Sequence, residues 1–420
     1  MKRKNMTRRE LLRRSAALGV IAGTNVLSAV SLVGCKAKPR LEVDAGAWRE
    51  ISSPVPLGSL SPRVTTLPGE SAALSWLEPK EDRSAALRIS IWRDARWSPP
   101  ASIAAGQAFS RDRASAPGVI GLSPRTLIAY WSQRASTEQQ STNEIALYMA
   151  VSNDGGTQWT PPLLVNRAAA QPGEDNAYAS AVRMDDARAQ FIWLDGRDWD
   201  KQKRVQLISR VANADGHLSE VRLLDPDTCT CCSTSIVETP HGLLAAYRGH
   251  TPENIRDISV VRREVAGGWS EPRVAHADRW HIEACPVNGP HLDANASRTA
   301  LVWFTAPQDK PEVKLAFSDD GGADFTPPVR LDAGKAVGRA QVALLADNSA
   351  IAFWLESEGG TAHVMARRSG DNGALGALVE LARGSNLGYL HVARAAGGIL
   401  VAWAERDPTS QVHTGLLRVS

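Results

Sequence analysis

The stretch AALSW at residues 72–76 is an apolar run that ends in an aromatic residue, and it recurs along the chain in six variants. The variants are TLIAYW (126–131), AQFIW (189–193), LLAAY (243–247), TALVW (299–303), AIAFW (350–354) and ILVAW (399–403). Their aromatic residues are separated by 55, 62, 54, 56, 51 and 49 positions. A repeat of this length, built from short apolar runs, predicts an array of similar structural units.

Each unit contains further runs typical of β-strands, separated by clusters of Gly, Pro, Asn and Asp. A shorter run precedes the aromatic one, as in RVTTL (63–67), and a third follows in all but the last unit, as in LRISIW (87–92). Those units also have a fourth run, such as PPLLVN (161–166). Four antiparallel strands in each unit, repeated radially, predict an all-β fold, a β-propeller. We count seven blades, with six as the alternative if one weak unit is not a full blade.

The last unit has no fourth run of its own, because the chain ends at HTGLLRVS (413–420). The segment AWREIS (47–52), before the first unit, resembles the fourth-strand segment GWSEP (268–272). We therefore expect this N-terminal strand to complete the last blade, which would pair an open sheet edge and join the two chain ends.

The first 35 residues have the order of a secretion signal: a basic head, a weakly apolar stretch and small residues before Cys35. TRRELL (7–12) resembles the twin-arginine signal, which exports folded proteins, and LVGC (32–35) resembles a bacterial lipobox, which implies acylation of Cys35. An uncleaved anchor helix is the alternative. We expect residues 1–34 to be a signal peptide, 35–44 a lipidated tether and 45–420 the propeller.

The location expected from this signal is extracytoplasmic, in the periplasm, with lipid on Cys35 as the contact with the membrane. Lys36 follows Cys35, where an inner-membrane retention signal has Asp, so the outer membrane is favoured. Residues 1–34 contribute +6 of charge against +3 for the whole chain, which leaves about −3 for the rest. The basic character therefore belongs to the signal, and no nucleic-acid partner is expected.

Two turn segments carry a family resemblance: SNDGGTQW (152–159) and SDDGGADF (318–325). Both lie between the third and fourth strands of their units, and both are followed by Pro-Pro. In such a turn the Asp accepts main-chain N–H groups, Gly permits positive φ, and the aromatic residue packs into the blade. The segments resemble the Asp-box of sialidases and related BNR-repeat propellers. The resemblance implies a sialidase-like propeller, and it covers roughly residues 45–420.

The cysteines other than Cys35 are concentrated at one place. Cys229, Cys231 and Cys232 lie in the loop before one inner strand, and Cys285 lies in the loop before the next. His281 and Glu283 precede Cys285 by four and two residues. In a propeller these loops lie on the face that usually binds ligands. Such a Cys/His/Glu group suits a soft metal, copper or zinc, with these six residues as candidate ligands.

Other states of the same cysteines remain open. Two disulfides are one alternative, since an oxidising compartment allows them. One disulfide between the loops with two free thiols is another, and a redox-active thiol role is a third.

The resemblance to sialidases also implies a catalytic set. Sialidases bind the substrate carboxylate with three arginines. They use a Tyr nucleophile that is assisted by a Glu, and an Asp serves as the general acid and base. The positions that match loosely are Arg63, Arg248, Arg339 and Tyr389. Arg63 is not in an Arg-Ile-Pro motif, and Ser does not follow Tyr389. Asp82 and Asp195 are eligible as the acid, whereas Glu238 falls at the far end of an inner strand.

Three functions follow from these observations. The first is an anchored extracytoplasmic propeller that binds a ligand or a soft metal ion. The second is an exo-sialidase-type hydrolase that acts on acidic sugars. The third is a non-catalytic scaffold with disulfides, with an envelope protein or a glycan as its partner.

Overall fold

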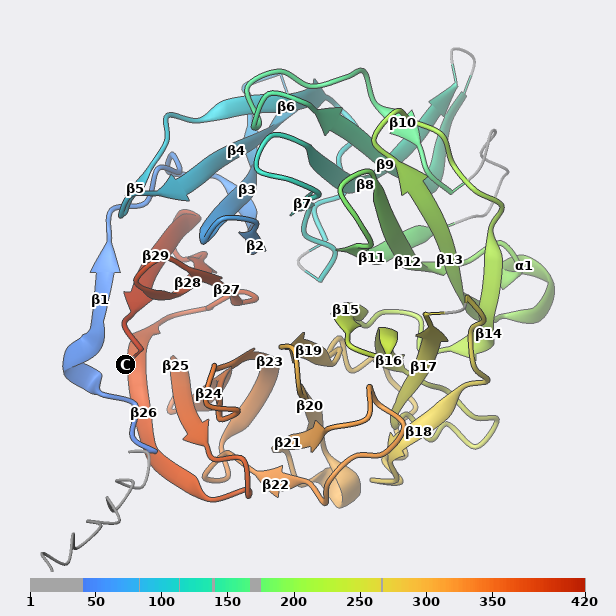
Figure 1. The fold of residues 1–420 in the computed structure, drawn as a ribbon. Helices are drawn as coiled ribbons and strands as arrows, with labels where there is room; N and C mark the ends of the chain where they lie inside the picture. Colours follow the sequence, from blue (N-terminus) through green and yellow to red (C-terminus); the bar gives the residue numbers. More distant parts are fainter. Residues whose placement is uncertain are drawn as a thin grey trace, which may run out of the picture. The chain divides into compact units, whose positions relative to one another are not determined.

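The structure of the protein is a computed structural model that describes residues 41–82, 84–112, 114–137, 140–166, 175–265 and 267–419. The predicted signal peptide and the predicted lipid site at Cys35 lie outside these residues. The described part of the chain forms a ring of seven antiparallel sheets around a central axis, as Figure 1 shows. The seven-bladed propeller is thus confirmed, and the six-bladed alternative is wrong.

The blades are numbered here in chain order, from the inner strand outward. Blade 1 comprises β2 (Leu60–Leu67), β3 (Ser71–Pro79), β4 (Ala85–Arg93), β5 (Arg96–Trp97) and β6 (Ala101–Gly106). Blade 2 comprises β7 (Gly118–Gly121), β8 (Leu127–Thr137), β9 (Gln140–Ser152) and β10 (Leu163–Leu164). Blade 3 comprises β11 (Asn176–Arg183), β12 (Arg188–Asp195), β13 (Val205–Asn213) and β14 (Arg222–Thr228). In blade 1 both β5 and β6 pair with β4, so its outer edge is divided between two short strands.

The remaining blades follow the same order. Blades 4 to 7 comprise β15 (Ser235–Thr239), β16 (Gly242–Arg248), β17 (Ile258–Glu264), β18 (Arg273–His276); β19 (His291–Ala294), β20 (Thr299–Thr305), β21 (Glu312–Ser318), β22 (Val329–Arg330); β23 (Ala336–Leu344), β24 (Ala350–Glu358), β25 (Thr361–Ser369), β26 (Leu375–Gly384); and β27 (His391–Ala395), β28 (Gly398–Glu405), β29 (Gln411–Leu417), β1 (Trp48–Ile51). The described helices are the short η1 (Ala45–Ala47), α1 (Trp199–Gln202) and η2 (Pro307–Asp309). Among the described residues, no helix has the length and apolar character needed to span a membrane.

The N-terminal strand closes the ring as expected. β1 pairs antiparallel with β29, with Trp48 opposite Leu417 and Ile51 opposite Thr414. The first and last described strands of the chain thus share one sheet (Figure 1). Val43, within the predicted tether, is also buried in the core.

The core lies between the blades and is built from the repeated aromatic runs. All seven repeat aromatics lie on the second strand of a blade, and each is at most 2% exposed: Trp76, Trp131, Trp193, Tyr247, Trp303, Trp354 and Trp403. The second strands are buried on both faces, which explains why they are continuous apolar runs rather than alternating ones.

The two Asp-box turns have the predicted local structure. In the first, Asp154 Oδ1 accepts the hydroxyl of Ser152 at 2.8 Å and the main-chain N–H groups of Thr157 and Gln158 at 3.0 and 2.9 Å. In the second, Asp320 accepts the main-chain N–H of Asp324 at 2.9 Å. These bonds satisfy main-chain groups that the turn would otherwise leave unpaired.

Candidate functional site

Two loops meet where the inner strands of blades 4 and 5 begin. The loop before β15 carries Cys229, Cys231 and Cys232, and the loop before β19 carries Cys285. A disulfide joins Cys231 to Cys285, with a Cα–Cα distance of 6.2 Å. Cys229 and Cys232 remain free thiols. This arrangement is the alternative with one disulfide between the loops and two free thiols.

The two free thiols are buried next to each other. Cys229 and Cys232 are 0% and 1% exposed, and their Sγ atoms lie 3.6 Å apart. The Sγ atoms of Cys229, Cys231 and Cys232 all lie within 4.8 Å of one another. Arg256 Nη1 lies 3.3 Å from Cys229 Sγ. Arg256 lies in the loop before β17, and nothing in the sequence pattern indicates that it contacts Cys229.

The free thiols differ in acidity. The hydrogen bond from Cys232 and the guanidinium groups of Arg248 and Arg256 lower the pKa of Cys229 to about 5. Desolvation, together with the charge of Cys229, raises the pKa of Cys232 well above its ordinary value. At neutral pH the pair is therefore one thiolate and one thiol that donates to it.

The other predicted metal ligands lie apart from these sulfurs. His281 Nε2 contacts Glu283 Oε1 at 3.1 Å, and the two side chains are 58% and 72% exposed. Glu283 also accepts a hydrogen bond from Asn254 at 2.8 Å. Among the described residues, the group close enough to share a metal ion contains Cys229, Cys231 and Cys232. The structure therefore does not bring His281 and Glu283 into one cluster with the free thiols.

Arg248, a candidate for binding a substrate carboxylate, uses its guanidinium for hydrogen bonds within the protein. Its side chain is 1% exposed, and its guanidinium donates to the main-chain oxygens of Asn288, Arg256 and Phe304 at 2.6–2.9 Å. The guanidinium also lies 4.9 Å from the ring centre of Trp280. Arg248 thus joins blade 4 to the loop before blade 5 and does not present its donors to a ligand.

Arg339 and Tyr389 are brought together beside the cysteine loops. Arg339 Nη1 donates to the Tyr389 hydroxyl at 2.5 Å, and its guanidinium lies 4.2 Å from the ring centre. The Tyr389 hydroxyl donates to the main-chain oxygen of Val287. Val287 also packs against the buried cysteines. Asn288 Oδ1 accepts the main-chain N–H of Arg339 at 2.7 Å, so the loop of Cys285 holds this pair in place.

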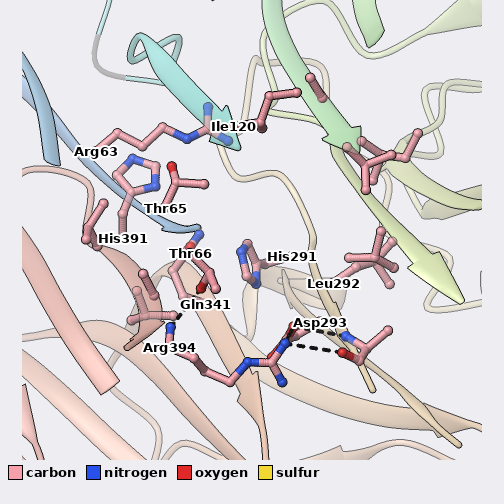
Figure 2. Close-up of a pocket in the computed structure, with 18 of the residues that line it drawn as sticks. Arg63, Thr65, Thr66, Ile120, His291, Leu292, Asp293, Gln341, His391 and Arg394 are labelled. Carbon is pink, nitrogen blue, oxygen red and sulfur yellow. Dashed lines mark hydrogen bonds and ion pairs between the residues drawn. The ribbon is translucent and has the colours of Figure 1, made fainter. Parts of the chain in front are cut away.

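Arg63 lies elsewhere, in a cavity of about 480 Å³ lined by residues of all seven inner strands. Figure 2 shows Arg63 and His391 close together, with His291 on a neighbouring part of the wall. Burial and the nearby charge of Arg63 lower the pKa of His291 to about 3 and that of His391 well below its ordinary value. The sequence prediction did not include His291, which looks like any polar residue at the start of a strand.

The remaining acidic candidates lie at three different places. Glu238 lines the same cavity as Arg63, whereas Asp195 is buried in an ion pair with Arg197 at 2.7 Å. Asp82 is exposed in a turn with Ser84, and its hydrogen bonds with Ser84 lower its pKa. Arg248, Arg339 and Tyr389 are not among the residues that line the cavity of Arg63. The predicted sialidase set is therefore not assembled around one cavity.

No protein-family model and no curated protein matches the chain. Several solved structures are similar in fold. A protein of unknown function from Dyadobacter fermentans is 14% identical with a TM-score of 0.50, and the match covers 89% of this chain and 100% of that one. The polysaccharide lyase Uly1 is 9% identical with a TM-score of 0.51, and the match covers 87% and 91%. The Trypanosoma rangeli sialidase is 10% identical with a TM-score of 0.45, and the match covers 88% and 59%.

These similarities concern the fold alone. The chain is an all-β propeller of seven blades, and its structural neighbours are sialidase-like and related propeller proteins.

Proposed function

We propose that this protein is a lipid-anchored extracytoplasmic propeller that binds a soft metal ion, copper(I) or zinc, at Cys229, Cys231 and Cys232. The observation that carries the proposal is the proximity of the three sulfurs, all within 4.8 Å of one another in a buried loop. Thiolates at Zn–S distances of about 2.3 Å in a tetrahedral site lie roughly 3.8 Å apart. The 3.6 Å separation of Cys229 and Cys232 is close to that value.

The charges around the sulfurs favour copper(I). Two thiolates around a monovalent ion leave one net negative charge, and the guanidinium of Arg256 at 3.3 Å from Cys229 offsets it. Thiolate ligands and a buried site also suit a soft ion. Cys229 and Cys232 supply two ligands while the Cys231–Cys285 disulfide is intact, and reduction of that disulfide supplies Cys231 as a third.

Metal titration of the purified, reduced protein tests this proposal. Copper(I) is added in the presence of a competing chelator, and bound metal is measured per chain after gel filtration. We expect one ion per wild-type chain and loss of binding in a Cys229→Ser, Cys232→Ser double variant. Cys285→Ser is the matched control, because it retains the three clustered sulfurs. Equal binding by the double variant, or none by the wild type, would overturn the proposal.

The anchor is proposed from the first 36 residues. Lipid on Cys35 is the membrane contact, twin-arginine export delivers the folded domain, and the outer membrane is favoured by Lys36. Cell fractionation tests these points. Cys35→Ser should move the protein from the membrane to the soluble periplasmic fraction, and replacement of Arg8 and Arg9 by Lys should stop export. Retention of Cys35→Ser in the membrane would contradict lipid anchoring.

A glycoside hydrolase of sialidase type is the second candidate, with an acidic glycan as the partner. The contact between Arg339 and Tyr389 favours it, since a cation beside the hydroxyl stabilises a tyrosinate nucleophile. The burial of Arg248 weighs against it. Turnover of a fluorogenic sialoside that is lost in Arg339→Ala would support this candidate, and its absence on a broad glycoside panel would exclude it.

A further inference from the structure

The Cys231–Cys285 disulfide connects the protein surface to the buried thiols. Cys285 is exposed and lines a cleft of about 410 Å³, together with Trp199, Lys203 and His250. At the other end of the bond, Cys231 is only 8% exposed. The Cys231 sulfur lies within 4.8 Å of the sulfurs of both Cys229 and Cys232, which are almost fully buried. A disulfide that reaches the cleft at one end thus lies within 4.8 Å of both sulfurs of a dithiol at the other.

We propose that the protein carries out thiol–disulfide exchange, in which Cys285 accepts an external disulfide and Cys231 passes the oxidation to the Cys229/Cys232 pair. The substrate class is an accessible disulfide R–S–S–R, small enough for one sulfur to enter the cleft. The activity uses the cysteines of the proposed metal site, but it requires no metal.

Each step of this exchange is balanced. In the fully reduced protein, the Cys285 sulfur attacks R–S–S–R, forms a mixed disulfide and releases one R–S⁻. Cys231 then attacks Cys285, which forms the Cys231–Cys285 bond and releases the second R–S⁻. Cys229 next attacks Cys231, and the electron pair of the broken bond leaves on Cys285. Finally, Cys232 attacks Cys229 and Cys231 leaves as a thiolate. The net change is one Cys229–Cys232 disulfide formed and two R–SH released.

The geometry supports this order of events. Exchange occurs by direct attack of one sulfur on another, so it depends on access to the sulfur that is attacked. The cleft gives access to Cys285, whereas Cys229 and Cys232 are enclosed. The contact of Arg256 with Cys229 at 3.3 Å stabilises negative charge on the sulfur that attacks Cys231. The Cys229 and Cys232 sulfurs, 3.6 Å apart, need only a small movement to form the final bond.

Peptide mapping of the metal-free protein tests the relay. The full chain is reduced, freed of reductant and metal without oxygen, and mixed with glutathione disulfide. Samples are quenched in acid at intervals, alkylated and analysed by mass spectrometry. We expect the glutathione adduct of Cys285 first, and the Cys229–Cys232 disulfide afterwards. In Cys231→Ser the Cys285 adduct should persist, and the Cys229–Cys232 disulfide should form at least about tenfold more slowly.

Two further variants keep the test decisive. Cys285→Ser should also slow formation of the Cys229–Cys232 disulfide, and Cys232→Ser should stop the exchange before the last step. Circular dichroism and melting curves check that each variant folds, and the order of adducts in the wild type tests the relay without any variant. Equal rates in the wild type and Cys231→Ser would overturn the proposal, as would a wild type that never forms the Cys229–Cys232 disulfide. Because no metal is present, either result leaves the metal proposal to its own titration.

Discussion

The guanidinium of Arg248 donates hydrogen bonds to the main-chain oxygens of Asn288, Arg256 and Phe304. Replacing Arg248 with Met keeps most of the side-chain length but leaves these buried oxygens unpaired. We expect the free energy of unfolding to fall by about 3–5 kcal/mol, which urea denaturation measures. Arg188→Met is the matched control, because Arg188 forms an exposed ion pair with Asp185 and its loss costs about 0–1 kcal/mol. Similar losses in both variants would contradict a structural role for Arg248.

His291 and His391, which line the cavity of Arg63, should make the free energy of unfolding depend on pH. In the folded protein the pKa of His291 is lowered to about 3 and that of His391 lies well below its ordinary value. The unfolded chain protonates both at about pH 6.5, so it binds more protons than the folded state below that pH. The free energy of unfolding should therefore fall as the pH decreases from about 6.5, by about 1.4 kcal/mol per pH unit for each histidine. For His291 this loss ends near pH 3.

Urea denaturation between about pH 6.5 and 5 measures this slope while most carboxylates remain ionised. His291→Asn is the informative variant, because its Oδ1 can replace Nδ1 as acceptor of the Val342 main-chain N–H at 3.2 Å. We expect a shallower slope in His291→Asn than in the wild type. Equal slopes would show that the pKa of His291 does not differ between the folded and the unfolded state.

At the scale of single elements, the second Asp-box predicts how a turn stabilises a blade. Gly322 has φ +85°, and an added Cβ would lie 2.4 Å from Leu244 Cδ1. Gly322→Ala therefore combines backbone strain of about 1–2 kcal/mol with a steric clash. Gly360→Ala is the control, since Gly360 has nearly the same φ, +84°, but no atom within 4 Å of an added Cβ. Thermal melting should show the larger decrease for Gly322→Ala, and equal decreases would mean that the contact with Leu244 is unimportant.

The elements were predictable because their signals are local. The apolar runs that end in Trp193 and Trp303 indicate strands that are buried on both faces. The turn of Asp154 is stabilised by hydrogen bonds formed by its own side chains. The site was less predictable. The sequence placed the four cysteines in adjacent loops, but the choice of Cys285 as partner of Cys231 depends on the path of both loops. In the same way, nothing in the sequence distinguishes a buried Arg248 from one that faces a ligand.

At the scale of the whole molecule, the ring depends on one short strand that comes from the other end of the chain. β1 contributes four residues to the last blade, and Trp48 packs near Trp403 with ring centres 6.1 Å apart. On β29, Gly415 lies beneath the indole: an added Cβ would lie 2.0 Å from Trp48 Cη2. The absence of a side chain at residue 415 is therefore a condition for closing the ring.

Gly415→Ala tests this condition. The added methyl group should displace Trp48 and loosen β1, because the indole is held by its packing against Trp403 and the hydrophobic core around it. We expect a lower melting temperature and faster proteolysis between residues 41 and 52, with the other blades cleaved more slowly. Gly106→Ala is the matched control, since Gly106 also lies in a strand and has no atom within 4 Å of an added Cβ. If both variants melt together and resist protease equally, the packing of Trp48 on Gly415 does not hold the ring closed, and the main-chain pairing of β1 with β29 must be sufficient.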